Sequence, residues 1–264
     1  MARLGGAGPG VARLGRARIM GRRNFSGGEL NTRRRIMARE MAKRYTVNLT
    51  GETPLLMHQD NLAWEDVMVQ WRKDPANKKA SVAGDDRSPA FRWIGNLYID
   101  NGMVVVPADN LMTLLREGGN LCPTGGGMGK KKSYKAATQS GIVVDQAAWP
   151  LLNRGKTIAY KDIIALKNNK EFGEHVQAVA DMGFELFVKR ARIGQAKHVR
   201  VRPRFDSWAC SGTLTVLDDS ITLDVLRDIL TFAGTYCGMC DWRPSSPKSP
   251  GPWGKFNAKV EVMK

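Results

Sequence analysis

The stretch Leu97-Tyr-Ile-Asp-Asn-Gly-Met-Val-Val-Val106 carries the clearest local structural signal in the chain. It places Asn101-Gly102 between two apolar runs, and these two residue types adopt the positive φ angles that a two-residue hairpin turn requires. Pro107 then ends the second strand, because proline cannot donate to a sheet ladder. Asp109 is expected to cap a helix that ends at Gly118-Gly119, with inward residues Leu111, Leu114 and Leu115. The first expected unit is therefore an antiparallel hairpin that runs into a helix.

Strand and helix patterns also alternate in the rest of the chain. Residues 45–50 and 255–263 alternate apolar and polar side chains, which is typical of half-buried strands. Asp60 is expected to cap a helix that has Trp64, Met68 and Trp71 on one face, and Thr222 is expected to cap another. Further strands are expected at 142–144, 184–188 and 210–217, and a helix around 172–179. This order predicts an α+β fold with a mainly antiparallel sheet rather than a doubly wound parallel one.

The charge of the chain indicates the kind of partner. The 264 residues carry a formal net charge of +16, and the sequence pI is near 10.0. An excess this large favours a polyanion, either nucleic acid or an acidic membrane surface. No apolar run approaches the roughly 20 residues that span a bilayer, and the basic residues do not lie on a membrane-binding amphipathic helix. Nucleic acid is therefore favoured, and no membrane partner is expected.

Residues 1–42 differ in composition from the rest of the chain. They contain ten arginines and two acidic residues, which account for half of the net charge. A segment so rich in arginine and poor in apolar residues cannot bury enough surface to fold alone. It is either a disordered basic arm that binds RNA, an organelle transit peptide, or a stretch upstream of a true start at Met37 or Met41. A single folded domain is expected over residues 43–264, which still carry a net positive charge.

The four cysteines are Cys122, Cys210, Cys237 and Cys240. They are too few for a disulfide framework in a chain of this length, so a reducing, cytoplasmic location is expected. Cys237 and Cys240 have the spacing of half a zinc site or of a redox pair, but a zinc site needs about four ligands and no second CxxC or HxxxH occurs. The favoured interpretation is two small residues packed at a helix end, and neither a metal nor a cofactor is expected.

The most informative segment is residues 189–204, KRARIGQAKHVRVRPR, which holds seven Lys or Arg and no acid. On a strand, alternate positions share a face, so Arg200, Arg202 and Arg204 are expected to form a row along which a phosphate chain lies. Lys130, Lys131 and Lys132, in a glycine-rich loop, are expected to form a second clamp. The alternative is a solvated basic face without a ligand. The other candidates in the segment are Lys189, Arg190, Arg192, Lys197 and His198.

Trp242 and Trp253 lie in a loop rich in glycine and proline, where large apolar side chains are costly to leave exposed. They either stack on bases, with Arg243 on a phosphate, or pack the loop on the domain. Both interpretations stay open. Trp64, Trp71 and Trp93 are expected in the core.

Catalytic signals are weaker. His58 follows an apolar run after the first strand and has the chemistry of a general acid or base in a metal-free ribonuclease. Asp85, Asp86 and Asp241 have the carboxylates of a magnesium nuclease site. No catalytic fingerprint supports these candidates, so a protein that does no chemistry of its own is favoured.

Three motifs occur in order along the domain: Gly51-Glu-Thr-Pro-Leu-Leu-Met-His58, Val105-Val-Pro-Ala-Asp-Asn-Leu-Met-Thr-Leu-Leu-Arg116, and Gly238 followed by Gly251-Pro-Trp-Gly-Lys-Phe256. Together they resemble the RAMP superfamily of CRISPR-associated proteins, most closely its backbone subunits that coat guide RNA. The resemblance covers about half of residues 44–264 in ordered pieces. Asp109-Asn110 departs from it, because the family has small residues after the proline.

The resemblance implies an RRM or ferredoxin-like antiparallel sheet with helices on one face and a large basic insertion. Insertions would lie at about 72–92 and 120–205, and Arg116 and the loop 251–255, with Lys255, would lie on the RNA path. It implies an RNA-binding subunit for antiviral defence that oligomerises along a guide RNA in a multi-subunit complex. Two alternatives remain open. One is a phage- or plasmid-type protein that binds or anneals single-stranded DNA. The other is a RAMP-type endoribonuclease, for which the resemblance implies a loop aspartate, Asp60, Asp85 or Asp86, and for which His58 is a further candidate.

Overall fold

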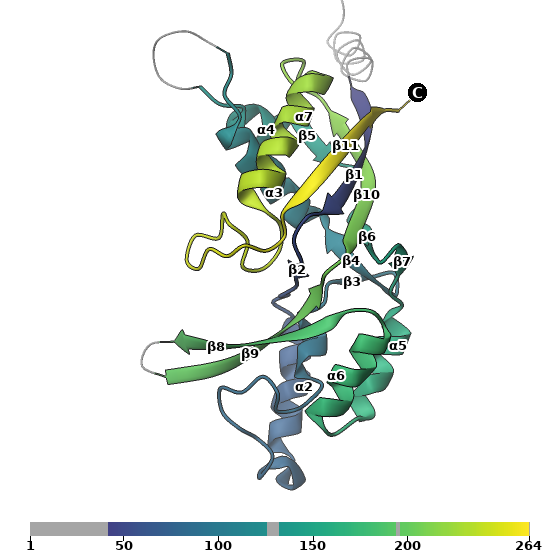
Figure 1. Cartoon of the computed structure of the whole chain (residues 1–264), viewed down its shortest axis with the longest axis vertical. Coiled ribbons are helices and arrows are strands. Elements are labelled where there is room, and N and C mark those ends of the chain that lie inside the picture. Colours follow the sequence, from purple (N-terminus) through teal and green to yellow (C-terminus); the bar gives the residue numbers. More distant parts are fainter. Residues whose placement is uncertain (1–41, 126–131, 194–195, 264) are drawn as a thin grey trace, which may run out of the picture. The chain divides into compact units, whose positions relative to one another are not determined.

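A sheet of eight strands runs through the part of the chain that the structure describes (Figure 1). The computed structural model describes residues 42–125, 132–193 and 196–263, all within one unit from Met41 to Lys264. The order is β11-β1-β10-β6-β4-β3, with β5 paired to β10 and β7 to β6, and the pairings are antiparallel. The strands are β1 (Lys43–Gly51), β3 (Ile99–Asp100), β4 (Met103–Pro107), β5 (Ile142–Val144), β6 (Ala148–Asn153), β7 (Lys156–Thr157), β10 (Trp208–Val216) and β11 (Phe256–Val262).

The expected α+β class with a mainly antiparallel sheet is therefore confirmed, and several local predictions are confirmed with it. The Asn101-Gly102 turn joins β3 to β4, with φ angles of 47° and 72° at the two turn residues. Strand β5 has the expected bounds. Thr222 caps the last helix, since its side chain accepts a hydrogen bond from the backbone N–H of Val225.

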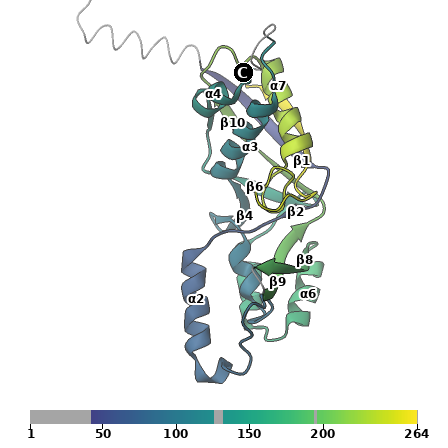
Figure 2. The same cartoon turned by 90° about the vertical axis from the view of Figure 1, so that its left-hand side faces the viewer.

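Two helices, α3 (Ala108–Leu121) and α7 (Leu223–Phe232), lie side by side on one face of this sheet (Figure 2). A short helix, α4 (Lys135–Gly141), packs against α3, and a π-helical turn over Ala233–Cys237 extends α7. Strand β1 directs alternate residues toward the helices, so burial of those apolar side chains holds the layers together. The side chains that meet there are Val47, Leu49, Leu111, Leu114, Leu115, Trp149, Leu214 and Leu230.

The expected helix boundaries need correction at two places. Gly118-Gly119 does not end α3, which continues to Leu121. Both glycines are buried, and a Cβ on Gly118 would lie 2.5 Å from the carbonyl oxygen of Ile229, so glycine serves a close helix contact rather than a stop. Asn61, and not Asp60, caps the helix that follows it, because the Asn61 side chain accepts from the backbone N–H of Trp64. Asp109 lies in the first turn of α3 and not at its cap.

A second sheet has the order β2-β9-β8 and contacts the helix Phe172–Asp181 and the 3-10 turn Arg92–Asn96. Its strands are β2 (Leu55–Leu56), β8 (Glu185–Ile193) and β9 (Ala196–Phe205); the helices are α2 (Leu62–Lys73), α5 (Tyr160–Ala165) and α6 (Phe172–Asp181), with 3-10 turns at Pro75–Asn77, Arg92–Asn96 and Leu166–Asn168. The Phe184 ring contacts the rings of Trp93 and Phe205 in the core. The stretch 120–205, expected as an insertion, also supplies β5, β6 and β7 to the main sheet.

His175 on α6 is fully buried and bonded through both ring nitrogens. Trp93 Nε1 donates to His175 Nδ1 at 3.1 Å, so the ring is neutral and Nε2–H faces the carbonyl oxygen of Asn169 at 3.2 Å. Burial lowers the pKa of His175 below its ordinary value of 6.5. The unfolded chain therefore binds a proton at a pH where the folded chain does not.

Stability is accordingly expected to be complete above pH 6.5 and to fall as the pH drops toward the lowered pKa of His175. The loss is at most about 1.4 kcal/mol per pH unit from this group. Urea unfolding between pH 5 and pH 8 measures it. His175→Gln should unfold at lower urea concentration at pH 8, but its free energy of unfolding should depend less on pH. His58→Gln is the comparison, because the pKa of His58 is also lowered. An unchanged slope in His175→Gln would contradict this account.

The four cysteines are buried free thiols, and Cys237 stands at the end of the turn that follows α7. Burial raises the pKa of Cys237 to about 11 and that of Cys240 to about 12, so both remain protonated and weakly nucleophilic.

In the described ranges, no helix has the length and apolar character needed to cross a bilayer.

Candidate nucleic-acid interface

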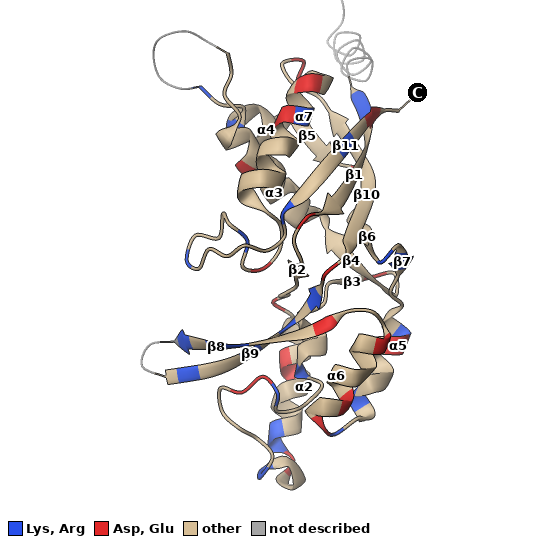
Figure 3. Cartoon of the chain, viewed as in Figure 1, with Lys and Arg blue, Asp and Glu red and all other residues tan. Residues whose placement is uncertain are grey.

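Strands β8 and β9 form an antiparallel hairpin in which Lys189 lies opposite Arg200 and Arg192 opposite Lys197. The half near the core is held by buried Leu186, Val201 and Phe205. In the half near the turn, the side chains are exposed: Lys189, Arg190, Arg192 and Lys197. Figure 3 shows basic segments on both strands toward the free end of this hairpin. Since side chains alternate between faces, Lys189 lies on one face of the hairpin, and Arg190 and Lys197 lie on the other.

The arginines of β9 share one face, but each of them has carboxylate partners. Arg200 Nη1 lies 3.1 Å from Asp86 Oδ1. Arg202 Nε lies 2.9 Å from Asp241, and its Nη1 lies 3.4 Å from Asp86. Arg204 pairs with Asp206 at 2.7 Å and with Glu185 at 3.4 Å. The three arginines share a face as expected, but they do not form an open row: Arg202 is only 6% exposed, and Asp86 and Asp241 compensate the charge of its buried guanidinium.

Asp86 is the centre of this arrangement and is 3% exposed. Besides Arg200 and Arg202, Arg92 Nε lies 3.5 Å from it, and the backbone N–H of Val201 donates to it. The segment that carries Asp86 runs along β9, where the backbone of Val199 bonds to Gly84 and Asp86. Asp86 therefore fastens this segment to the hairpin.

The aspartates proposed for a magnesium site are engaged elsewhere. Asp85 binds the Arg87 guanidinium at 2.6 Å, which keeps the pKa of Asp85 low through that hydrogen bond. Asp86 and Asp241 meet on Arg202 rather than on a shared open position. Within the described residues, no group of three or more His, Cys, Asp or Glu side chains is placed to hold a metal ion.

Trp242 and Trp253 pack against the hairpin through Phe187 on β8. Their rings lie 5.8 Å and 5.4 Å from the Phe187 ring, both edge-on. Lys189 Nζ lies 4.5 Å from the centre of the Trp242 ring, and the Arg204 guanidinium lies 5.5 Å from that of Trp253. The structure shows that both tryptophans pack on the domain, and both residues remain partly exposed.

The other basic candidates are spread over different elements. Arg243 Nη2 pairs with Glu117 of α3 at 3.0 Å. Lys255 precedes β11, where its backbone bonds to Thr53. Lys132 is exposed beside α4, and Lys130 and Lys131 lie outside the described residues. Arg243, Lys255 and Lys132 are thus not part of the β8–β9 hairpin.

His58 lies shortly before the N-terminus of α2 and lines a pocket together with Asp86, Arg200 and Arg202. Its side chain makes no hydrogen bond with the described residues, while its backbone oxygen accepts from Tyr98 Oη at 3.0 Å. Loss of hydration and then the charge of Arg202 lower the pKa of His58, so its ring is neutral at pH 7. Asp60 lines the same pocket.

Sequence interpretation did not place Arg92, Phe187 or Glu117 in this region. For Phe187 the strand period was a usable signal, because Phe187 shares a face with Lys189. Arg92 and Glu117 lie in other elements, and no local pattern marks them as partners of distant charges. No protein-family model matches the chain, and a search of curated proteins found no similar protein.

Proposed function

We propose that this protein binds single-stranded RNA through the end of the β8–β9 hairpin, by charge and shape rather than by chemistry on the strand. The observation that carries the proposal is the excess positive charge there. Lys189, Arg190 and Lys197 are exposed and form no ion pair with any described residue, whereas the arginines nearer the core are neutralised by carboxylates. Exposed cations of this kind bind phosphates and release counterions.

The arrangement of the main sheet supports an RRM or ferredoxin-like core. Strands β11, β1, β10 and β5 lie in that order, all antiparallel. Helices α3 and α4 precede β5, and α7 lies between β10 and β11. A βαββαβ chain with two inserted segments gives this strand order. The second of the inserted segments carries the basic hairpin.

The proposed role is that of a backbone subunit which oligomerises along a guide RNA in a CRISPR-type effector complex, as the RAMP-like motifs suggest. The partly exposed rings of Trp242 and Trp253 beside the hairpin support single-strand binding, because bases stack on aromatic side chains irrespective of sequence. A single neutral histidine, His58, is not sufficient for a nuclease site. We therefore propose a non-catalytic role.

A competition between RNA and DNA of one sequence tests the choice of RNA. The protein is expected to prefer the single-stranded RNA, because a surface that follows an RNA strand meets the 2′-hydroxyls that DNA lacks. Fluorescence anisotropy with a labelled RNA and unlabelled RNA or DNA competitors measures the preference. Equal or tighter binding of the DNA would contradict the proposal and would support the alternative of a single-stranded DNA-binding or annealing protein.

A further inference from the structure

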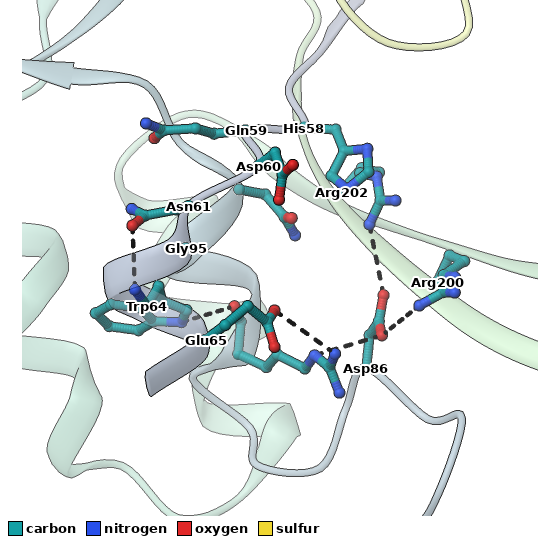
Figure 4. Close-up of a pocket in the computed structure, with 12 residues that line it drawn as sticks. His58, Gln59, Asp60, Asn61, Trp64, Glu65, Asp86, Gly95, Arg200 and Arg202 are labelled. Atoms are coloured by element: carbon teal, nitrogen blue, oxygen red, sulfur yellow. Dashed lines mark hydrogen bonds and ion pairs between the residues drawn. The ribbon is translucent and has the colours of Figure 1, made fainter. Parts of the chain in front are cut away.

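A pocket of about 190 Å³ opens between the segment from His58 to Asn61, the N-terminal turn of α2 and strand β9 (Figure 4). Trp64 forms one wall, held by a hydrogen bond from its Nε1 to the Arg92 carbonyl and packed on Gly95. Pockets for drug-sized ligands measure roughly 300–1,000 Å³. This pocket is therefore of a size for one nucleobase or one small ion, and not for a whole nucleotide.

The charges that line the pocket are balanced. Its wall contains three carboxylates and three guanidinium groups: Asp60, Glu65 and Asp86 against Arg92, Arg200 and Arg202. His58 adds no charge at pH 7, because its pKa is lowered. A phosphate group needs an excess of positive charge, and it would face the carboxylate of Asp60 here. The balance therefore favours a neutral ligand that carries both hydrogen-bond donors and acceptors.

Two of these groups are available to such a ligand. The Asp60 carboxylate makes no hydrogen bond or ion pair with any described residue, and it points into the open centre of the pocket in Figure 4. Arg200 stands across the pocket with 26% of its side chain exposed, and among the described residues its guanidinium bonds only through Nη1, to Asp86. A guanidinium has five N–H donors. The pocket thus offers an acceptor on one side and free donors on the other.

A nucleobase has the matching pattern, since its different edges carry both donors and acceptors. Guanine combines N–H donors that suit Asp60 with a carbonyl oxygen that suits Arg200. Arg200 lies directly opposite Lys189 in the hairpin, and the two side chains share a face, so a strand that contacts Lys189 on that face passes the pocket.

We propose that this pocket receives a guanine base of the bound strand, with Asp60 as acceptor and Arg200 as donor. The inference rests on the proposed function, because the strand is the one held by the hairpin, and it adds base preference to binding by charge.

The test compares two labelled single-stranded RNAs of about 12 nucleotides, one of uridines only and one with a central guanosine. By fluorescence anisotropy, the parent protein is expected to bind the guanosine-containing strand about tenfold more tightly. Asp60→Asn, which replaces one acceptor by donors, should lose this preference and keep the affinity for the uridine strand. Asp66→Asn, at an exposed position on α2, is the matched control and should behave like the parent.

A parent protein without the guanosine preference would overturn the proposal, and so would an Asp60→Asn variant that retains it. If guanosine 5′-monophosphate alone binds as tightly as the strand, the pocket is a mononucleotide site and the proposal is also wrong. Failure of the parent to bind either strand is a different result, because it overturns the proposed RNA-binding function itself.

Discussion

Changing Lys189, Arg190 and Lys197 together to glutamate is expected to weaken binding of single-stranded RNA about 100-fold at about 0.1 M salt. Each phosphate contact with a single strand contributes about 0.7 to the slope of log affinity against log salt. Loss of three contacts lowers that slope by about 2. Over the roughly tenfold range between about 1 M and about 0.1 M salt, a slope change of about 2 corresponds to a loss of about 100-fold in affinity. The three side chains are exposed and form no ion pair with the described residues, and the contact of Lys189 with Trp242 is worth only about 0.5–1 kcal/mol at such a site, so the fold should be retained. Anisotropy titrations at several salt concentrations measure both quantities.

The matched control changes Lys73, Lys78 and Lys79 to glutamate. These side chains are also exposed, and they lie at the end of α2 and in the loop after it, so the net charge changes equally at a different place. This control is expected to lose at most a few-fold in affinity through the long-range charge effect. Equal losses in both variants would refute a binding site on the hairpin. The triple change of Arg200, Arg202 and Arg204 is not a usable test, because Arg202 is buried in an ion-pair network.

Asp86→Ala is expected to lower the free energy of unfolding by about 3–5 kcal/mol. Removal of one partner from a buried ion pair leaves the other charge uncompensated, and here Arg200, Arg202 and Arg92 lose their shared carboxylate. Asp241 still neutralises Arg202 in part, at 2.9 Å. The midpoint of urea unfolding, followed by circular dichroism, measures the change.

Asp85→Ala is the comparison for this second prediction. Among the described residues, the Asp85 side chain bonds only to Arg87, two residues along the chain, so its loss should cost no more than about 1 kcal/mol. A stable Asp86→Ala variant would show that the arginines do not depend on this carboxylate. The comparison of Asp86→Ala with Asp85→Ala also matters for the question of catalysis. If Asp86→Ala lost an RNA-cleaving activity, the loss would be explained by unfolding and would not identify Asp86 as catalytic.

Much of the main sheet was predictable because its signals are local. The alternation in β1 and β11 is a property of a few consecutive residues, and the Asn101-Gly102 turn depends only on its own φ angles. The cap at Thr222 is local in the same way, because its side chain accepts a hydrogen bond from the backbone N–H of Val225, three positions later.

The partners of the basic residues were not predictable from local pattern. The strand period placed Arg200 and Arg202 on one face, but nothing near them in sequence indicates that Asp86 and Asp241 would bind them. Asp86 lies in a polar loop that reads as solvent-exposed, and it is buried only because the fold brings that loop against β9. The helix end predicted at Gly118-Gly119 was wrong for a related reason. Sequence alone does not distinguish a glycine that permits close contact between helices from a glycine that ends a helix.

Strand β8 forms one border of the second sheet, and among the described residues it pairs only with β9. Its outer row of backbone N–H and C=O groups is open to another extended chain, which is the usual route to aggregation of β proteins. Lysine and arginine on such a border oppose that route, because two copies would have to bring like charges together. The same side chains proposed to hold RNA would thus keep the RNA-free protein from self-association along this border.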